Sequence, residues 1–422
     1  MTPEIKHRIG QIRRGEVPER YVKTALGLAP ANWKRYTFGD IYTERKEPGD
    51  ENLPLLMVSI HSGVSDGEVD AAELPKQVKR IEDKSQYKKA VSGDLVFNMM
   101  RAWQGAIGTA RTTGMVSPAY IVAEPNDKAY PLFMDYYSRT PQMINQIDRQ
   151  SYGVTDFRKR LYWDSFAPIS CTLPPIEEQQ KIATILTTQD RVIELKEKQL
   201  AEKQRQKKYL MQQLLTGKKR LPGFSGAWKN IKLCEVLSER KEKNIEQNLR
   251  ICSVAVQKGV IDQIEHLGRS YAASDTSNYS VAHYGDIIYT KSPTGDFLYG
   301  IVKQNLLQET IAVSPLYGVF TPMTFGLGYF LHTYFQSAIC AQNYLLPIVQ
   351  KGAKNTINIT NDTFISSKLY LPLDVEEQKA IADTFIAADH EIDLLRQDIE
   401  QEKQKKKALM QLLLTGIVRV KT

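Results

Sequence analysis

The chain has 422 residues, of which 42% are hydrophobic and 25% are charged, and its formal net charge is +8. These are ordinary globular values that exclude a largely disordered chain, and the length suffices for two domains with separate cores. Residues 1–17 contain no apolar core of a secretory signal. The most apolar stretch, residues 325–349, is interrupted by polar residues such as His332 and Asn343. We therefore expect a cytoplasmic protein without a membrane span.

The pattern predicts five segments in chain order. A helical segment over residues 1–31, including Arg20–Pro30, comes first, and the sequence assigns it no role. A globular region over 32–172 and a long helix over 173–220 follow, and then a second globular region over 221–371 and a second long helix over 372–422.

The two globular regions share short motifs at nearly constant separation. "TERKE" at Thr43–Glu47 matches "SERKE" at Ser238–Glu242, an offset of 195 residues. "SGDLVFN" at Ser92–Asn98 parallels "YGDIIYT" at Tyr284–Thr290, an offset of 192 residues, and both read as a Gly-Asp turn followed by a strand. The changing offset indicates that strands are kept while loops vary in length. We expect mixed α/β folds, with helical stretches at 132–148 and 328–345 packed against the strands.

The long helices repeat without any gap. Glu177–Gln179 recurs as Glu376–Gln378, and "LMQQLLTG" at Leu210–Gly217 recurs as "LMQLLLTG" at Leu409–Gly416, each 199 residues later. A period this long indicates duplication of a whole domain rather than a solenoid. Each helix follows a proline-bearing stretch and ends at a glycine, which predicts left-handed C-caps.

Apolar residues on both helices follow the alternating 4- and 3-residue spacing of a coiled coil. The predicted core consists of Ile182, Leu186, Ile193, Leu200, Leu210 and Leu214 on the first helix and Ile381, Phe385, Ile392, Leu395, Ile399, Leu409 and Leu413 on the second. The polar residues Gln189, Lys196 and Lys203 weaken the first of these seams. We expect the helices to pair with each other, antiparallel if a pseudo-twofold axis relates the two halves.

The positive charge is spread over the body of the chain and peaks on the first long helix, where residues 173–220 contain 11 basic and 6 acidic residues. A basic surface fits a polyanionic partner such as nucleic acid. Two interpretations of the lysines between Lys196 and Arg220 remain open. They form a solvated helix face, or they face DNA or a partner subunit.

Two pairs of loops differ most between the halves. Met99–Arg111 corresponds to Lys291–Lys303, and Ser151–Arg160 corresponds to Gln350–Ile359. All contain glycine with polar and basic residues, which can contact base edges or phosphates. The candidate DNA-binding residues are Arg101, Trp103, Gln104, Arg158 and Lys159 in the first half, and Lys291, Lys351, Lys354 and Asn355 in the second. The alternative is that these are ordinary solvated loops.

Motifs of common catalytic sites are missing from the sequence. There is no G-x-x-x-x-G-K-[ST] phosphate loop, no H-E-x-x-H and no Asn/Asp-Pro-Pro-aromatic motif. The four cysteines show no C-x-x-C spacing, which argues against a zinc site and a disulfide framework. We therefore predict no catalytic residue, no metal site and no cofactor on this chain, and expect a binder rather than an enzyme.

The chain resembles the specificity subunits of type I DNA restriction–modification enzymes. The resemblance rests on the Pro…Glu-Glu-Gln helix starts, the "KKYLMQQLLTG" and "KKALMQLLLTG" helix ends, and "RLPGFSGAWK" at Arg220–Lys229. It covers nearly the whole chain. It implies an α+β architecture in which two mixed α/β target recognition domains are joined by an intramolecular antiparallel coiled coil, with pseudo-twofold internal duplication.

The resemblance also implies function and partners. Each recognition domain would read one half-site of a bipartite sequence in double-stranded DNA, and the coiled coil would set the gap between them. Two methyltransferase subunits, using S-adenosylmethionine, and two translocase–nuclease subunits, using ATP and magnesium, would complete the complex. Two other classes stay open: a self-contained DNA-modifying enzyme with degenerate motifs, and a coiled-coil scaffold for protein partners.

Overall fold

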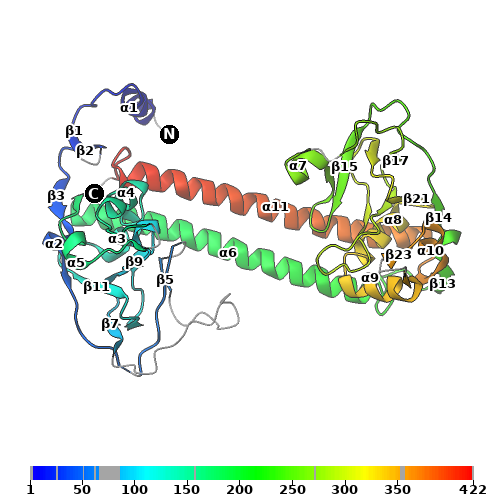
Figure 1. Ribbon diagram of the computed structural model, residues 1–422, viewed down its shortest axis with the longest axis horizontal. Coiled ribbons are helices and arrows are strands. Elements are labelled where there is room, and N and C mark those ends of the chain that lie inside the picture. The colour runs from blue at the N-terminus through cyan, green and yellow to red at the C-terminus, as the bar shows by residue number, and fades with distance from the viewer. Residues whose placement is uncertain are drawn as a thin grey trace. The chain divides into compact units, whose positions relative to one another are not determined.

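The structure is a computed structural model that describes residues 3–24, 27–50, 52–60, 63–65, 86–155, 158–269, 272–351 and 357–420. It consists of two compact units. The first unit extends to Leu195 and resumes at Ile399, and the second is the continuous stretch Lys196–Asp398. The long helices α6 (Ile176–Leu214) and α11 (Val375–Leu414) therefore each contribute one half to each unit (Figure 1).

The first unit combines short strands with small helices. Its helices are α1 (Pro3–Arg13), α2 (Phe38–Ile41), α3 (Pro131–Tyr137), α4 (Pro141–Arg149) and α5 (Trp163–Phe166), with the 3-10 turn η3 (Ala102–Gln104). Its strands are β1 (Tyr21–Thr24), β2 (Gly27–Pro30), β3 (Lys34–Thr37), β4 (Tyr42–Glu44), β5 (Val58–Ser59), β6 (Gly63–Val64), β7 (Lys88–Ala90), β8 (Leu95–Asn98), β9 (Ile107–Thr109), β10 (Gly114–Val116), β11 (Tyr120–Pro125) and β12 (Ser170–Leu173).

The second unit repeats this plan of short strands and small helices. Its helices are α7 (Gln263–Leu267), α8 (Phe325–Tyr334), α9 (Ala338–Leu345) and α10 (Asn361–Ser366), with the turns η5 (Leu233–Glu235) and η6 (Leu346–Ile348). Its strands are β13 (Lys229–Lys232), β14 (Leu237–Glu239), β15 (Arg250–Ala255), β16 (Gly259–Asp262), β17 (Ser280–Ala282), β18 (Ile287–Tyr289), β19 (Val302–Gln304), β20 (Ile311–Val313), β21 (Gly318–Pro322), β22 (Gln350–Lys351), β23 (Ile357–Asn358) and β24 (Lys368–Leu371).

The same antiparallel four-stranded sheet occurs in both units. Its strand order is β4-β11-β8-β9 in the first unit and β14-β21-β18-β19 in the second. A second sheet, β16-β15-β20-β17, contains the parallel pair β15–β20. Its counterpart in the first unit is reduced to the pairs β5–β6 and β7–β10 and a parallel bridge between Leu55 and Met115. The predicted mixed α/β duplication is therefore present.

An arginine–aspartate pair joins the two motifs that recur in each globular region. Arg45 of "TERKE" contacts Asp94 through two hydrogen bonds of 2.7 and 3.2 Å. Arg240 of "SERKE" contacts Asp286 in the same way, at 2.6 and 3.1 Å. Both aspartates are 2% exposed. A buried carboxylate requires a hydrogen-bonding partner of opposite charge, and the arginine guanidinium supplies it. The contact therefore holds the Gly-Asp turn against the strand that carries the arginine.

The predicted helix over Arg20–Pro30 is wrong. The N-terminal helix α1 ends at Arg13, and β1 and β2 form an antiparallel pair from Tyr21↔Pro30 to Thr24↔Gly27. Gly15, with a φ of +77°, interrupts the helix, and the Tyr-Val-Lys-Thr stretch favours extended backbone. The two predicted helical stretches of the globular regions are likewise each split into two helices, α3 and α4 in one unit and α8 and α9 in the other.

The N-terminal segment covers the end of α11. The Tyr21 hydroxyl donates to the carbonyl oxygen of Gly416 at 2.6 Å, and Arg8 donates to the carbonyl oxygen of Ile417 at 3.0 Å. Gly416 itself has a φ of +70°, and its counterpart Gly217 has a φ of +68°. The predicted left-handed C-caps are therefore confirmed, and one of them is enclosed by the beginning of the chain.

The apolar seam positions on both helices are buried or half-buried. Ile182, Leu186 and Leu413 join the core of the first unit, and Leu214, Ile381 and Phe385 join the core of the second. Ile193, Ile392 and Ile399 are buried, and Leu200, Leu210, Leu395 and Leu409 are half-buried. The ends of the seam therefore pack into the globular cores of the two units.

The polar seam positions pair with carboxylates of the other helix. Within the second unit, Lys196 pairs with Asp398 at 2.6 Å, Lys203 with Glu391 at 2.7 Å and Lys207 with Asp389 at 2.5 Å. Numbers on α11 fall as numbers on α6 rise, so the two helix segments run antiparallel there. The solvated-face interpretation is wrong for these three lysines, because each ammonium group pairs with a carboxylate of the facing helix. Contact with DNA or a partner subunit stays an open alternative for them.

Candidate nucleic-acid interface

A tight turn after β8 presents the first group of candidate residues. Ala102 is fully buried and anchors the turn, while Arg101 and Gln104 on either side of it are exposed. The turn closes at Gly105, whose φ of +104° suits glycine. The Trp103 indole donates to the carbonyl oxygen of Met100 at 3.0 Å, which orients the ring along the turn.

The second loop of the first unit is held against this turn. Tyr152 and Arg160 exchange two backbone hydrogen bonds of 2.9 and 2.8 Å, so the loop between them doubles back. Gly153 is required there, because a Cβ would lie 2.5 Å from the backbone of Arg158. The Leu161 amide then donates to the carbonyl oxygen of Met99 at 2.9 Å, which ties this loop to the beginning of the other.

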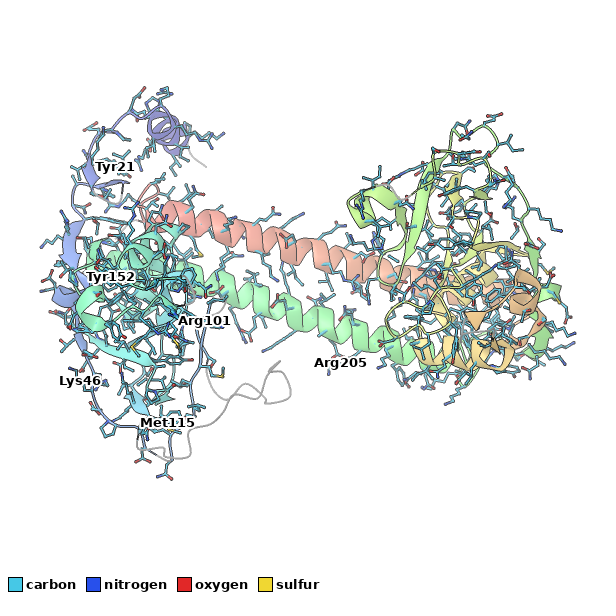
Figure 2. All side chains as sticks on the ribbon, in the orientation of Figure 1. Tyr21, Lys46, Arg101, Met115, Tyr152 and Arg205 are labelled. Carbon is cyan, nitrogen blue, oxygen red and sulfur yellow. The ribbon has the colours of Figure 1, made fainter. Side chains whose placement is uncertain are left out.

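Lys159 and Trp103 bring the two loops into direct contact. The Lys159 ammonium lies 4.9 Å from the centroid of the Trp103 ring and 2.7 Å from a carboxylate oxygen of Asp148. Arg101, Gln104 and Arg158 are exposed beside this contact. The two loops therefore bring the five candidate residues of the first unit together, with Arg101 labelled in Figure 2. The carboxylate of Asp148 partly neutralises the charge of Lys159.

Three exposed apolar side chains of the same loop and of the residues that follow it were missed as candidates. Tyr152 is 64% exposed, Tyr162 55% and Val154 92%. Aromatic and apolar groups exposed beside cations can stack on or pack against a bound nucleic acid. The signal was present, because Tyr152 and Val154 belong to one of the variable loops.

Lys291 of the second unit has a different environment. It has a φ of +59°, which is unusual for a residue other than glycine. A Cβ on Gly300 would lie 2.8 Å from the Lys291 amide nitrogen, so two backbone segments approach closely here. The side chain is half-buried, and burial lowers the pKa of its ammonium group against the opposing effect of Glu239. Lys291 therefore shapes the loop as well as carrying charge.

Of the remaining candidates of the second unit, the structure describes only Lys351. Lys351 is in β22, which pairs with β23 in the register Lys351↔Ile357. Lys354 and Asn355 lie outside the described residues.

Among the described residues, no group of three or more His, Cys, Asp or Glu side chains is placed to hold a metal ion. No helix in this part of the chain is long and apolar enough to cross a membrane.

Comparison with protein families gives one match over most of the chain. The family described as "Type I restriction modification DNA specificity domain" matches residues 77–205 and again residues 208–404. The two matches correspond to the two halves of the internal duplication.

Individual relatives and solved structures that resemble the chain belong to the same kind of system as the matched family. The chain is 23% identical to the type I restriction enzyme MjaVIII specificity subunit of Methanocaldococcus jannaschii, over 96% of this chain and 97% of that protein. It has a TM-score of 0.53 with a type I restriction–modification S subunit from M. genitalium, at 11% identity, covering 93% of this chain and 97% of the other. A structure from work on assembly of the type I R-M system gives a TM-score of 0.50 at 17% identity, over 92% and 99% of the two chains. These structural likenesses concern the fold.

Proposed function

Since this chain belongs to the type I restriction modification DNA specificity family, we propose that it reads a bipartite DNA sequence, one half-site for each globular part. Its general function, DNA sequence recognition within a type I restriction–modification complex, follows from the family. The proposal concerns how the two halves divide that task.

The main support for this proposal is that the two units share one scaffold but differ in the loops that it carries. Both units contain the same four-stranded sheet and the same buried arginine–aspartate pair. The loops after β8 and β18 differ in length and chemistry, with exposed Arg101 and Gln104 in one and half-buried Lys291 in the other. Two half-sites of different sequence require different base contacts on a common framework.

We further propose that α6 and α11 form an intramolecular antiparallel coiled coil that determines the gap between the half-sites. The reciprocal pairs Lys207–Asp389 and Lys406–Asp190 support it, because the duplication makes Lys207 equivalent to Lys406 and Asp190 to Asp389. A helix of 39 residues is about 58 Å long at 1.5 Å per residue.

In this proposal the chain is not a catalyst. It would dock two methyltransferase subunits, which hold S-adenosylmethionine, and two translocase–nuclease subunits, which use ATP and magnesium. Tight binding of S-adenosylmethionine by the isolated chain would contradict this assignment and favour a self-contained enzyme.

The test is the adenine methylome of the host, determined by single-molecule sequencing with and without this gene. Loss of one split motif, two short half-sites around a fixed gap, is the expected result. Exchange of the loop Met99–Arg111 should then change one half of the motif and leave the other half intact. An unchanged methylome, with the methyltransferase partner shown to be expressed, would contradict the proposal.

A further inference from the structure

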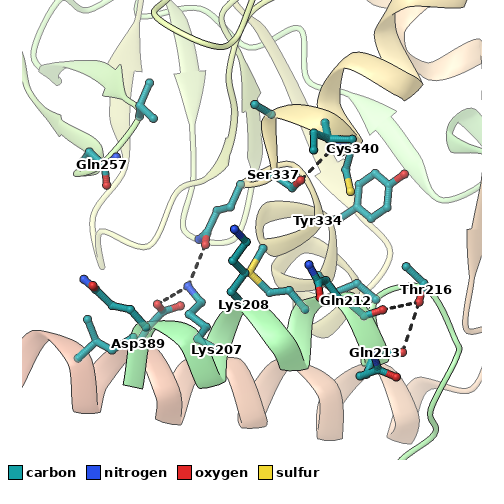
Figure 3. A pocket seen from close by; sticks show the side chains of 18 of the residues that line it. Lys207, Lys208, Gln212, Gln213, Thr216, Gln257, Tyr334, Ser337, Cys340 and Asp389 are labelled. Atoms are coloured by element: carbon teal, nitrogen blue, oxygen red, sulfur yellow. Dashed lines mark hydrogen bonds and ion pairs between the residues drawn. The ribbon is translucent and has the colours of Figure 1, made fainter. Parts of the chain in front are cut away.

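A cavity of about 890 Å³ lies within the second unit, between the C-terminal half of α6 and the helices α8 and α9 (Figure 3). Five basic side chains line it, Lys207, Lys208, Lys218, Lys303 and Arg396. Asp389 is the single carboxylate among the lining residues. The cavity therefore carries a surplus of positive charge.

The carboxylate of Asp389 is already engaged. One of its oxygens accepts from Lys207 at 2.5 Å, and the other accepts from the Tyr329 hydroxyl at 3.0 Å. Lys303 is 3% exposed, and among the described residues its ammonium group has no carboxylate within ion-pair distance. A buried ammonium without a counterion is costly, so its retention calls for an explanation.

The neighbouring polar groups add donors rather than acceptors. His332 accepts from the Gln304 amide through Nδ1 at 3.0 Å, so the neutral ring carries its proton on Nε2. That Nε2 lies 2.9 Å from Nε2 of Gln336, whose Oε1 already accepts from Lys207 at 2.8 Å. These polar neighbours thus bring no negative charge to the cavity beyond that of Asp389.

The first unit provides an internal comparison. Strand registers pair Leu95 with Thr109 and Ile287 with Gln304, so Gly108 occupies the position of Lys303. Asp135 accepts from the Thr109 amide as His332 does from the Gln304 amide, and it also pairs with Arg111 at 2.7 Å. The cations at this place in the first unit are neutralised by an aspartate. The second unit has a neutral histidine there and an additional buried lysine.

We propose that this cavity binds a small phosphorylated molecule of nucleotide size, whose phosphate is held by Lys303 and Lys207. Phosphate supplies several acceptor oxygens and more than one negative charge, and lysine ammonium groups are common phosphate ligands. Met211, Leu215 and Tyr334 line the same cavity and offer an apolar wall for the rest of the ligand. The volume lies within the range of about 300–1,000 Å³ that such sites occupy.

The experiment is calorimetric titration of the full-length chain with ADP and, separately, with inorganic phosphate, at constant ionic strength. We expect saturable binding of both probes. Replacing Lys303 with methionine removes a buried charge without adding a polar group, so the variant should fold. Its affinity should fall by about tenfold or more, as expected from loss of one charge-assisted hydrogen bond.

Lys258→Met is the matched control, because Lys258 is an exposed lysine of the same unit that does not line the cavity. It should bind ADP as the wild type does. Equal affinity in wild type and Lys303→Met, or no binding of either probe at millimolar concentration, would overturn the proposal. A Lys303-dependent response to duplex DNA but not to ADP would also overturn it. Because no step of the test measures sequence recognition, its outcome is independent of the function proposed above.

Discussion

Arg419 donates two hydrogen bonds to Glu178, at 2.6 and 2.7 Å, although the residues are 241 positions apart. The Trp33 indole donates to the same carboxylate at 3.3 Å. The second unit repeats this group, with Arg220 and Trp228 both donating to Glu377. In each unit, an arginine that lies shortly after the end of one long helix binds a glutamate in the first turn of the other.

Replacement of Arg419 with methionine should destabilise the first unit by about 3–5 kcal/mol, because Glu178, which is 1% exposed, would lose its countercharge. Urea denaturation followed by tryptophan fluorescence measures this change. The double variant Arg419→Met, Glu178→Gln should recover part of the loss. Arg220→Met should have the same effect on the second unit. A loss below about 1 kcal/mol would show that the pair is dispensable.

The two C-cap glycines should differ in their tolerance of alanine. Both have a positive φ, so Gly217→Ala and Gly416→Ala should each cost about 1 kcal/mol from backbone strain. A Cβ at position 416 would also lie 2.6 Å from Pro30, whereas the nearest atom at position 217 is 3.2 Å away, on Tyr370. The free energy of unfolding should therefore fall more in Gly416→Ala. Equal losses would mean that the N-terminal segment moves aside freely.

Arg101→Ala should weaken DNA binding by the assembled methyltransferase complex. If the exposed guanidinium reads a base, the loss should be about 1–3 kcal/mol and specificity should relax at one position. If it contacts phosphate, affinity should fall for all sequences, and the salt dependence should become shallower by about one charge. Titration of labelled duplexes at several salt concentrations separates these cases. Arg13→Ala, which removes an exposed arginine from α1, is the charge-matched control.

The ionisation of Lys303 should make the stability of the second unit depend on pH. Burial, with a smaller contribution from Lys207, lowers the pKa of this ammonium from 10.5 to about 8, against the opposing effect of Asp389. The unfolded chain therefore binds the proton more tightly than the folded chain. Below pH 8 the folded state bears the whole penalty, on the order of 3 kcal/mol, and the penalty disappears as the pH rises from about 8 to 10.5.

Lys303→Met removes this penalty, so the variant should be more stable than the wild type at pH 7. The difference in the free energy of unfolding between variant and wild type should shrink from pH 8 to pH 10.5. Chemical denaturation of both proteins at each pH measures it. A difference that does not change over this range would show that the lysine is fully solvated.

The cysteines should differ in reactivity. Burial raises the pKa of the Cys171 thiol to about 12 and that of Cys252 to about 11, which suppresses the reactive thiolate. Cys234 is exposed. Brief alkylation at pH 8 followed by mass spectrometry should label Cys234 and spare Cys171 and Cys252 until urea is added. Rapid labelling of Cys171 in the native protein would contradict the described core.

Periodicity and glycine were sufficient to predict the long helices. The 4- and 3-residue spacing identified positions such as Ile193 and Ile392, which are buried, because a helix repeats its faces regularly. The end of each helix followed from Gly217 and Gly416, since few other residues adopt a positive φ there.

Partners distant in the chain could not be predicted. Arg45 and Asp94 both belonged to recognised motifs, yet their contact depends on β11 pairing with both β4 and β8. Glu178 lies in the first turn of α6, where acidic residues are common, and nothing local distinguishes such a glutamate from one that is buried by Arg419. The assignment of residues 20–30 to a helix was instead a local error, because Tyr21–Thr24 favours extended backbone and pairs with the neighbouring strand Gly27–Pro30. The Lys196–Asp398 contact was missed because a lysine in a seam was treated as unpaired.

The second unit is continuous in sequence, whereas the first is interrupted by it. During synthesis, every residue of the second unit has been joined once Asp398 is added. The first unit must wait for Ile399 and the residues beyond it, among them Arg419. The half that begins earliest on the ribosome is therefore the last to be finished. A nascent chain that ends prematurely before Arg419 leaves the carboxylate of Glu178 without its cation, and this favours removal of incomplete products by proteases that act on unfolded chains.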